Sequence, residues 1–159
     1  LLHLEGDPWS ENDATGIGPS SKAFALDPGR IYMHRKSRFK RGSLSPAEAD
    51  GLREEISTAL SGLSYDGEVV FERIFRGEEL YPDCPYPHRP DLVCISRRAF
   101  DLKAKYNRSD IFGNFGRTGT HTADDAFFAD SYGSSASSVR QAGLEVLSFF
   151  RDPEKILIT

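Results

Sequence analysis

The run Leu92-Val93-Cys94-Ile95 constrains the fold more than any other stretch of this chain. Four consecutive apolar residues, with no polar alternation, are typical of a β-strand that is buried on both faces. Such strands lie in sheets that are covered by helices. The run therefore predicts an α/β fold, in which helices pack against a sheet.

A helix is expected to begin after Ser45, where the chain reads Ser45-Pro46-Ala47-Glu48. Ser45 can cap the helix, Pro46 suits its first position, and Glu48 completes a capping box. Gly62 is of the residue type that commonly ends helices. Between these signals, apolar residues recur at helical spacing and define one face: Ala49, Leu52, Ile56, Ala59, Leu60 and Leu63.

Further strands and one more helix are expected elsewhere. Residues 23–26 and 30–34 flank an Asp-Pro-Gly turn, which favours a pair of strands, and residues 69–75 have a β-branched and aromatic composition. Residues 126–129 are another strand candidate. A last helix is expected after Ser138, with an apolar face made of Val139, Ala142, Val146, Phe149 and Phe150.

Length and composition limit the class of protein. With 159 residues the chain fits one domain, so residues 21–159 are expected to form a single α/β domain after a loop or mobile segment of residues 1–20. The formal net charge of −4 excludes the strongly basic balance typical of nucleic-acid binders. No apolar run approaches the roughly 18 residues that a membrane span needs. Two cysteines, Cys84 and Cys94, are too few for a disulfide scaffold.

The segment Gly119-Thr120-His121-Thr122-Ala123-Asp124-Asp125-Ala126 carries the most specific chemical signal. It places a histidine in a turn of small residues, three residues before an acidic pair. Neutral imidazole is the commonest protein ligand for transition metals, and the carboxylates could orient it or share a cation with it. A lone histidine near two aspartates is also often a plain polar turn, so both interpretations stay open for the segment alone.

Four segments, taken in order, resemble the C-terminal part of the alkaline phosphatase superfamily, and most closely its type I phosphodiesterase and nucleotide pyrophosphatase branch. Residues 23–32 read A-F-A-L-D-P-G-R-I-Y, similar to the family's strand "A-x-A-L-x-x-G-x-I-Y". Pro90-Asp91-Leu92-Val93 and Phe100-Asp101-Leu102-Lys103 follow. The segment from Gly119 to Ala126 is similar to the turn "G-x-H-x-x-D-D-A" that holds the family's last metal-binding histidine. The resemblance covers residues 21–128.

The resemblance implies a three-layer α/β sandwich with a central mixed sheet. It also implies hydrolysis of phosphoesters with two divalent metals, usually zinc, between which a Thr or Ser attacks phosphorus. Carried over residue by residue, His121 is one of the metal ligands. Asp124 or Asp125 could accept the second N–H of that imidazole. Alternatively, one of them caps a turn and the other begins a strand.

Much of the family's active site has no counterpart in this chain. Thr15 lacks the context of the nucleophile motif, and no histidine follows an aspartate as in the family's Asp-His-Gly motif. The resemblance therefore implies the C-terminal portion of a larger catalytic domain, without a catalytic residue of its own, that works with the remainder of that domain. Its substrate would be a small phosphoester, either a monoester or a diester. The matched motifs leave a sulfate ester open as well.

A cluster of cations runs from Arg30 to Arg41. Arg35, Lys36 and Arg38 are candidates to attract an anionic phosphoester, or else belong to a solvated edge strand and loop. This cluster supports a second hypothesis, in which the chain is a non-catalytic binding module that uses residues 30–41 on an acidic partner. Half of a zinc site at Cys84 and His88 is a further possibility, but no second ligand pair exists at suitable spacing.

Overall fold

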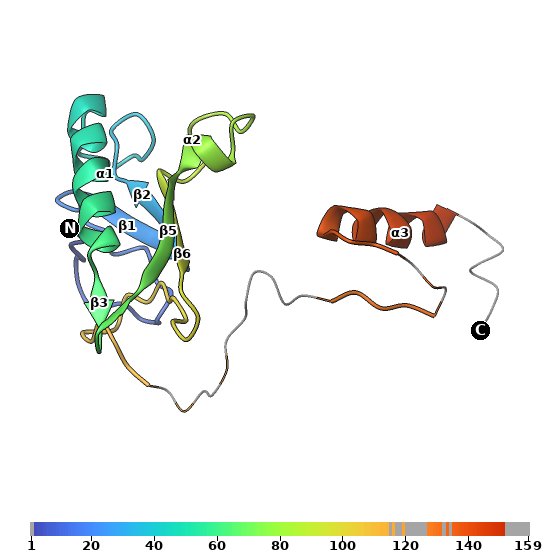
Figure 1. Ribbon diagram of the computed structural model, residues 1–159. Helices are drawn as coiled ribbons and strands as arrows, with labels where there is room; N and C mark the ends of the chain where they lie inside the picture. The colour runs from blue at the N-terminus through green and yellow to red at the C-terminus, as the bar shows by residue number, and fades with distance from the viewer. Residues whose placement is uncertain are drawn as a thin grey trace. The chain divides into compact units, whose positions relative to one another are not determined.

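The computed structural model describes residues 2–114, 116, 119, 127–131, 133 and 135–151. The chain divides into two compact units, Leu1–His121 and Thr122–Thr159. The first unit contains a β-sheet with a long helix, and the described residues of the second include a helix (Figure 1). The predicted combination of helices and strands is confirmed. The single domain expected over residues 21–159 stays a prediction.

An antiparallel sheet of four strands organises the first unit, in the order β1-β2-β6-β5. The apolar run predicted to be a buried strand is β6, which pairs with strands on both sides. Leu92, Val93 and Cys94 are buried, whereas Ile95 is 39% exposed, so burial on both faces ends before the strand does. The bounds of the four strands are β1 Ala23–Asp27, β2 Arg30–Met33, β5 Phe71–Arg76 and β6 Leu92–Ser96.

A small hairpin divides the strand that the sequence predicts over residues 69–75. β3 (Ser64–Tyr65) pairs with β4 (Glu68–Val69) across a turn in which Asp66 and Gly67 both have positive φ, as a tight hairpin turn requires. Val70 is buried between β4 and β5, and its N–H donates to the carbonyl of Leu63. The chain therefore turns into the main sheet only after this residue.

Helix α1 (Pro46–Ser61) covers one face of the sheet (Figure 1). Its predicted capping box is confirmed, because the N–H of Glu48 donates to Ser45 Oγ at 3.4 Å and the N–H of Ser45 donates to Glu48 Oε2 at 2.8 Å. The helix ends at Gly62, whose N–H donates to the carbonyls of the last turn. Its apolar face closes a core with the sheet, whose buried members are Ala23, Met33, Leu44, Ala49, Ile56, Leu92 and Cys94.

Two further helices are described. α2 (Gly77–Leu80) is a single turn directly after β5. α3 (Val139–Arg151) is the predicted last helix, and Ser138 Oγ accepts a hydrogen bond from its first turn. The described residues 127–129 of the predicted strand 126–129 do not form a strand, and Ala126 lies outside the described residues. No helix in the described part of the chain is long and apolar enough to cross a membrane.

The loop of residues 2–20 is closed by main-chain hydrogen bonds. The N–H of Glu5 donates to the carbonyl of Gly16 at 2.7 Å, and the N–H of Gly18 donates to the carbonyl of His3 at 2.8 Å. The hydroxyl of Ser21, at the end of this loop, donates to the carbonyl of His3 and is fully buried. These contacts anchor the loop at the start of β1.

Gly29 lies in the turn between β1 and β2, with a φ of +77°. A Cβ there would lie 2.6 Å from the carbonyl oxygen of Cys94, whereas a Cβ at Gly67, with a φ of +80°, would meet nothing within 4 Å. Both alanine variants should lose about 1 to 2 kcal/mol of stability from the left-handed backbone. Gly29→Ala should lose clearly more, because it also separates the turn from β6. Urea unfolding of both variants tests this, and equal losses would contradict the close approach of Gly29 to β6.

Candidate functional site

The predicted metal ligand and its two neighbours lie outside the described residues. The roles of His121, Asp124 and Asp125 therefore stay predictions. Among the residues that the structure describes, no group of three or more His, Cys, Asp or Glu side chains is placed to hold a metal ion. The three predicted substrate-attracting residues are described, and they lie in the loop that follows β2.

Two of those three residues, Arg35 and Arg38, converge on the carboxylate of Asp91. Arg35 donates to Asp91 Oδ1 from Nε at 3.2 Å and from Nη2 at 3.1 Å, and Arg38 Nη1 donates to Oδ2 at 3.3 Å. The N–H of Met33 donates to Oδ2 at 2.8 Å. Asp91 is only 5% exposed, so its charge is compensated by these four bonds in place of water.

Arg35 also connects the sheet to α1. Its Nη2 donates to Asp50 Oδ1 at 3.0 Å, and its Nη1 donates to the carbonyl of Pro46 at 3.4 Å. Burial alone lowers the pKa of Arg35, but the hydrogen bond to Asp50 and the charge of Asp91 outweigh it, so the pKa is raised overall. The guanidinium therefore stays charged and holds the first turns of α1 against the start of β6.

Arg38 lies among aromatic rings. Its guanidinium carbon is 4.7 Å from the ring centroid of Tyr32, 5.2 Å from that of Phe39 and 5.7 Å from that of Tyr86. Because the side chain is only 7% exposed, these cation–π contacts add to the bond with Asp91. Lys36, in contrast, is exposed and forms no ion pair with a described residue. The structure thus joins Arg35 with Arg38 and leaves Lys36 apart.

Acidic side chains neutralise much of the remaining cationic cluster. Arg30 pairs with Asp27 at 3.2 Å, and a hydrogen bond with Tyr81, followed by that with Asp27, raises its pKa. Arg41 pairs with Glu5 in the N-terminal loop. Four of the six cations between residues 30 and 41 therefore have a carboxylate partner within the chain.

A cavity of about 400 Å³ lies beside the Asp91 cluster, between the loop after β2, the first half of α1 and the loop after α2. Its wall contains both cations and anions. Among them, Arg53 Nη1 donates to Glu78 Oε1 at 3.0 Å, and Nη2 lies 3.9 Å from Asp50 Oδ1. The charged residues of the wall are Arg35, Asp50, Arg53, Glu78, Arg89 and Asp91.

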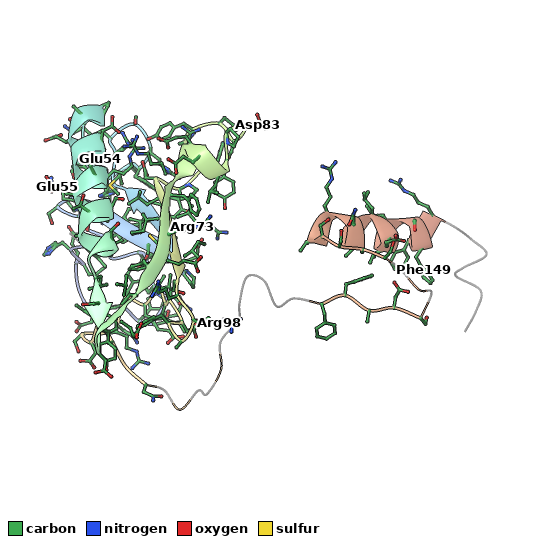
Figure 2. All side chains as sticks on the ribbon, in the orientation of Figure 1. Glu54, Glu55, Arg73, Asp83, Arg98 and Phe149 are labelled. Atoms are coloured by element: carbon green, nitrogen blue, oxygen red, sulfur yellow. The ribbon has the colours of Figure 1, made fainter. Side chains whose placement is uncertain are left out.

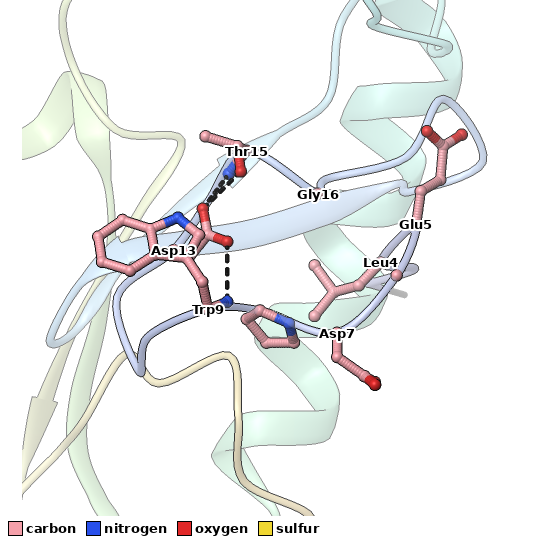
Figure 3. Close-up of a pocket in the computed structure, with 9 residues that line it drawn as sticks. Leu4, Glu5, Asp7, Trp9, Asp13, Thr15 and Gly16 are labelled. Atoms are coloured by element: carbon pink, nitrogen blue, oxygen red, sulfur yellow. Dashed lines mark hydrogen bonds between the residues drawn. The ribbon is translucent and has the colours of Figure 1, made fainter.

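A second cavity, of about 210 Å³, lies inside the N-terminal loop (Figure 3). Asp13 is buried beside it and accepts hydrogen bonds from the hydroxyl and the N–H of Thr15 and from the N–H of Trp9. The bonds from Thr15 hold the pKa of Asp13 below its usual range. This carboxylate therefore stabilises the loop and has little capacity left for a ligand.

Cys94 offers no nucleophile at neutral pH. Burial raises the pKa of the Cys94 thiol to about 11, so it stays protonated, and the thiolate is the reactive form. Cys84 is half-buried, and its thiol lies 3.9 Å from the carbonyl of Pro85. His88 is exposed, and the described residues supply no further ligands that would complete a zinc site with this pair.

Sequence analysis assigns no role to Asp91, although it belongs to one of the resembling segments. The signal that could have found it is a charged residue placed directly before a fully apolar strand, because such a residue is buried with the strand and needs partners. The cationic partners were visible in the sequence, but their convergence depends on the pairing of β2 with β6. Comparisons with models of protein families, with curated proteins and with solved structures find no match to this chain.

Proposed function

We propose that this chain is the C-terminal portion of a metal-dependent phosphohydrolase of the alkaline phosphatase superfamily, related to its phosphodiesterases and nucleotide pyrophosphatases. The chain contributes His121 as one ligand of a site for two divalent metals, with zinc the first candidate. Asp124 or Asp125 orients that imidazole. The remainder of the catalytic domain supplies the nucleophile and the other ligands. Paired metals of this kind stabilise the attacking and the leaving oxygen of an in-line displacement.

The observation that carries the proposal is that three resembling segments, far apart in the chain, meet in one core. β2 of the first segment pairs with β6 of the second through Arg30 with Val93 and Ile31 with Leu92. Leu102 of the third segment packs against the same core, beside the turn that contains Gly29. Segments selected only for their similarity to one family thus behave as neighbouring parts of one fold.

One apolar side chain of the sheet, that of Ile95, is exposed where a larger domain would cover it. A three-layer sandwich has helices on both faces of its sheet. α1 packs on the face to which Cys94 belongs, and Ile95, the next residue of β6, alternates to the opposite face. Ile95 is 39% exposed. This exposed side chain supports a further layer on the second face, as the larger sandwich requires. The four described strands pair only antiparallel, so the mixed sheet of the larger domain stays part of the proposal.

The binding-module hypothesis has a weaker basis. It needs the cations of residues 30–41 to face an acidic partner, yet Arg35 and Arg38 are committed to Asp91, and Arg30 and Arg41 have acidic partners of their own. Lys36 and Lys40 are the exposed cations of this stretch that form no ion pair with a described residue. Two exposed lysines give only a small positive surface for an acidic partner.

The isolated chain should not hydrolyse phosphoesters. A nucleophile and most metal ligands are missing, and this chemistry needs both in one preorganised site. The measurement is release of p-nitrophenol from p-nitrophenyl phosphate and from bis-p-nitrophenyl phosphate, with zinc or manganese present. Steady, metal-dependent turnover that disappears in the His121→Ala variant would contradict the proposal that the chain is only a portion of the enzyme.

The coding sequence upstream of Leu1 distinguishes the two hypotheses most directly. An open reading frame that contains a Thr or Ser nucleophile and an Asp-His-Gly motif would support the enzyme. A start codon immediately before Leu1 would support the binding module. Sequencing that region therefore tests the proposed function without any assay.

A further inference from the structure

The wall of the cavity beside Asp91 contains three arginines and three carboxylates, and Arg38 adds one more cation through its bond with Asp91, although the chain as a whole has a formal net charge of −4. Asp91, in the wall of the cavity, is bonded by Arg35 and also by Arg38. Counted together, the wall and this partner contain four arginines and three carboxylates, which leaves one cation in excess. Arg76 forms a neighbouring ion pair with Glu54, and Glu54 lies on α1 (Figure 2). This pair adds one charge of each sign and does not alter the excess.

Two arginines of the wall have hydrogen-bonding capacity left. Arg89 is half-buried, forms no ion pair with a described carboxylate, and donates from Nη1 to the carbonyl of Cys84 at 3.5 Å, the outer limit of a hydrogen bond. Arg53 Nε is buried without a hydrogen-bond partner, and its nearest carboxylate, that of Glu54, is 3.7 Å away. Buried donors are normally satisfied, so Arg53 Nε marks a place where an acceptor is missing, and the half-buried Arg89 keeps further N–H groups to donate.

The arginines are fixed, whereas two of the carboxylates are free to turn toward water. The side chains of Arg35 and Arg53 are 11% and 13% exposed, but those of Asp50 and Glu78 are 58% and 38% exposed. Exposed ion pairs contribute little stability, so an entering anion can replace these two carboxylates on the guanidinium groups at small cost. Asp91 remains with Arg35 and Arg38 and keeps the wall in place.

We propose that this cavity binds a small molecule through a phosphoryl group that carries one negative charge, as in a phosphodiester. One negative charge matches the single cation in excess. Three guanidinium groups around a cavity suit the tetrahedral oxygens of a phosphoryl group better than the two coplanar oxygens of a carboxylate. The hydroxyls of Ser37 and Tyr86, 3.3 Å apart in the same wall, provide donors for a further oxygen. The proposal does not involve His121 and needs no catalysis.

Calorimetric titration of the whole chain with dimethyl phosphate and with acetate, at low salt, tests the proposal. Dimethyl phosphate should bind saturably to one site per chain, and acetate should bind more weakly by about fivefold or more. Absence of saturable binding by dimethyl phosphate would overturn the proposal. Equal affinity for acetate would overturn the assignment to a phosphoryl group.

Matched charge variants locate the site. Arg89→Gln should weaken binding of dimethyl phosphate by about tenfold, because it removes the arginine that no carboxylate neutralises. Arg73→Gln removes the same charge from an exposed position on β5 (Figure 2) and should change affinity by less than about twofold. Similar losses in both variants would show that only net charge matters and would overturn the proposal.

A variant that removes a hydroxyl group tests the site without a change in charge and without a change in a buried side chain. Ser37 is exposed, so Ser37→Ala should keep the melting temperature and weaken binding by about threefold through the loss of one donor. Thermal melts of all variants confirm that they fold. If Arg89→Gln does not fold, unchanged affinity in Ser37→Ala overturns the placement in this cavity.

Discussion

Asp91→Ala is expected to lower the free energy of unfolding by about 3 to 5 kcal/mol, the cost of removing one partner from a buried ion pair. The substitution leaves Arg35 and Arg38 together in a pocket where their side chains are 11% and 7% exposed. It also removes the acceptor of the Met33 N–H at the end of β2. Urea unfolding followed by circular dichroism measures the loss.

Two further variants separate burial from charge. Asp50→Ala removes another carboxylate from Arg35, but Asp50 is 58% exposed, so the loss should stay within about 1 kcal/mol. Asp91→Asn keeps an acceptor for the Met33 N–H but removes the charge. Its loss of unfolding free energy should therefore lie between those of Asp50→Ala and Asp91→Ala. If Asp91→Ala were as mild as Asp50→Ala, the cluster would not hold β2 and β6 together as described.

His121→Ala in the intact protein is expected to abolish most phosphoester hydrolysis and hardly change stability. The surrounding sequence is Gly and Thr, so the truncation should stay within the usual 0.5 kcal/mol or so of substitutions away from a packed core. Loss of a metal ligand acts differently, because the remaining ligands hold the ion loosely. Catalysis needs the site geometry to hold within about 0.5 Å. Thermal melts, metal content and turnover are the three measurements.

Asp125→Asn provides the graded comparison for that experiment. A group that only orients a metal-bound imidazole typically contributes about 10 to 100-fold in affinity or activity, so this variant should retain measurable turnover. Full metal content and near-parental turnover in His121→Ala would show that His121 does not have the role that the family resemblance assigns to it.

Local signals in the sequence were sufficient for several elements. The capping box at Ser45 and Glu48 places the start of α1 correctly, because cap and helix lie within a few residues of each other. The apolar run at Leu92 predicts an interior strand, because such runs are typical of strands buried on both faces, and three of its four residues are buried. The hairpin at Asp66-Gly67 does not stand out in the sequence, although an Asp-Gly pair is a strong hairpin signal, because each of its strands has only two residues and carries no apolar alternation.

The cluster around Asp91 depends on contacts between residues that are distant in the chain, and no local sequence pattern encodes such contacts. Arg35 and Asp91 are far apart in the chain, and they meet because β2 and β6 pair in a particular register. If the cations of residues 30–41 lay on an exposed edge strand without acidic partners, they would attract an anion. The sequence alone is compatible with both arrangements. Whether a cation is already neutralised is a tertiary property, and it decides how much of the cluster a ligand can use.

The position of β6 has a consequence for the order in which the first unit can fold. β6 lies between β2 and β5, yet it follows both of them in the chain. The β1–β2 hairpin and α1 need only local contacts, whereas the sheet closes only when residues 92–96 bridge back to a strand that ends at residue 33. Long loop closure of this kind slows folding. Without residues 92–96, β2 and β5 each lack the neighbour that pairs with both, and only β6 joins them into one sheet.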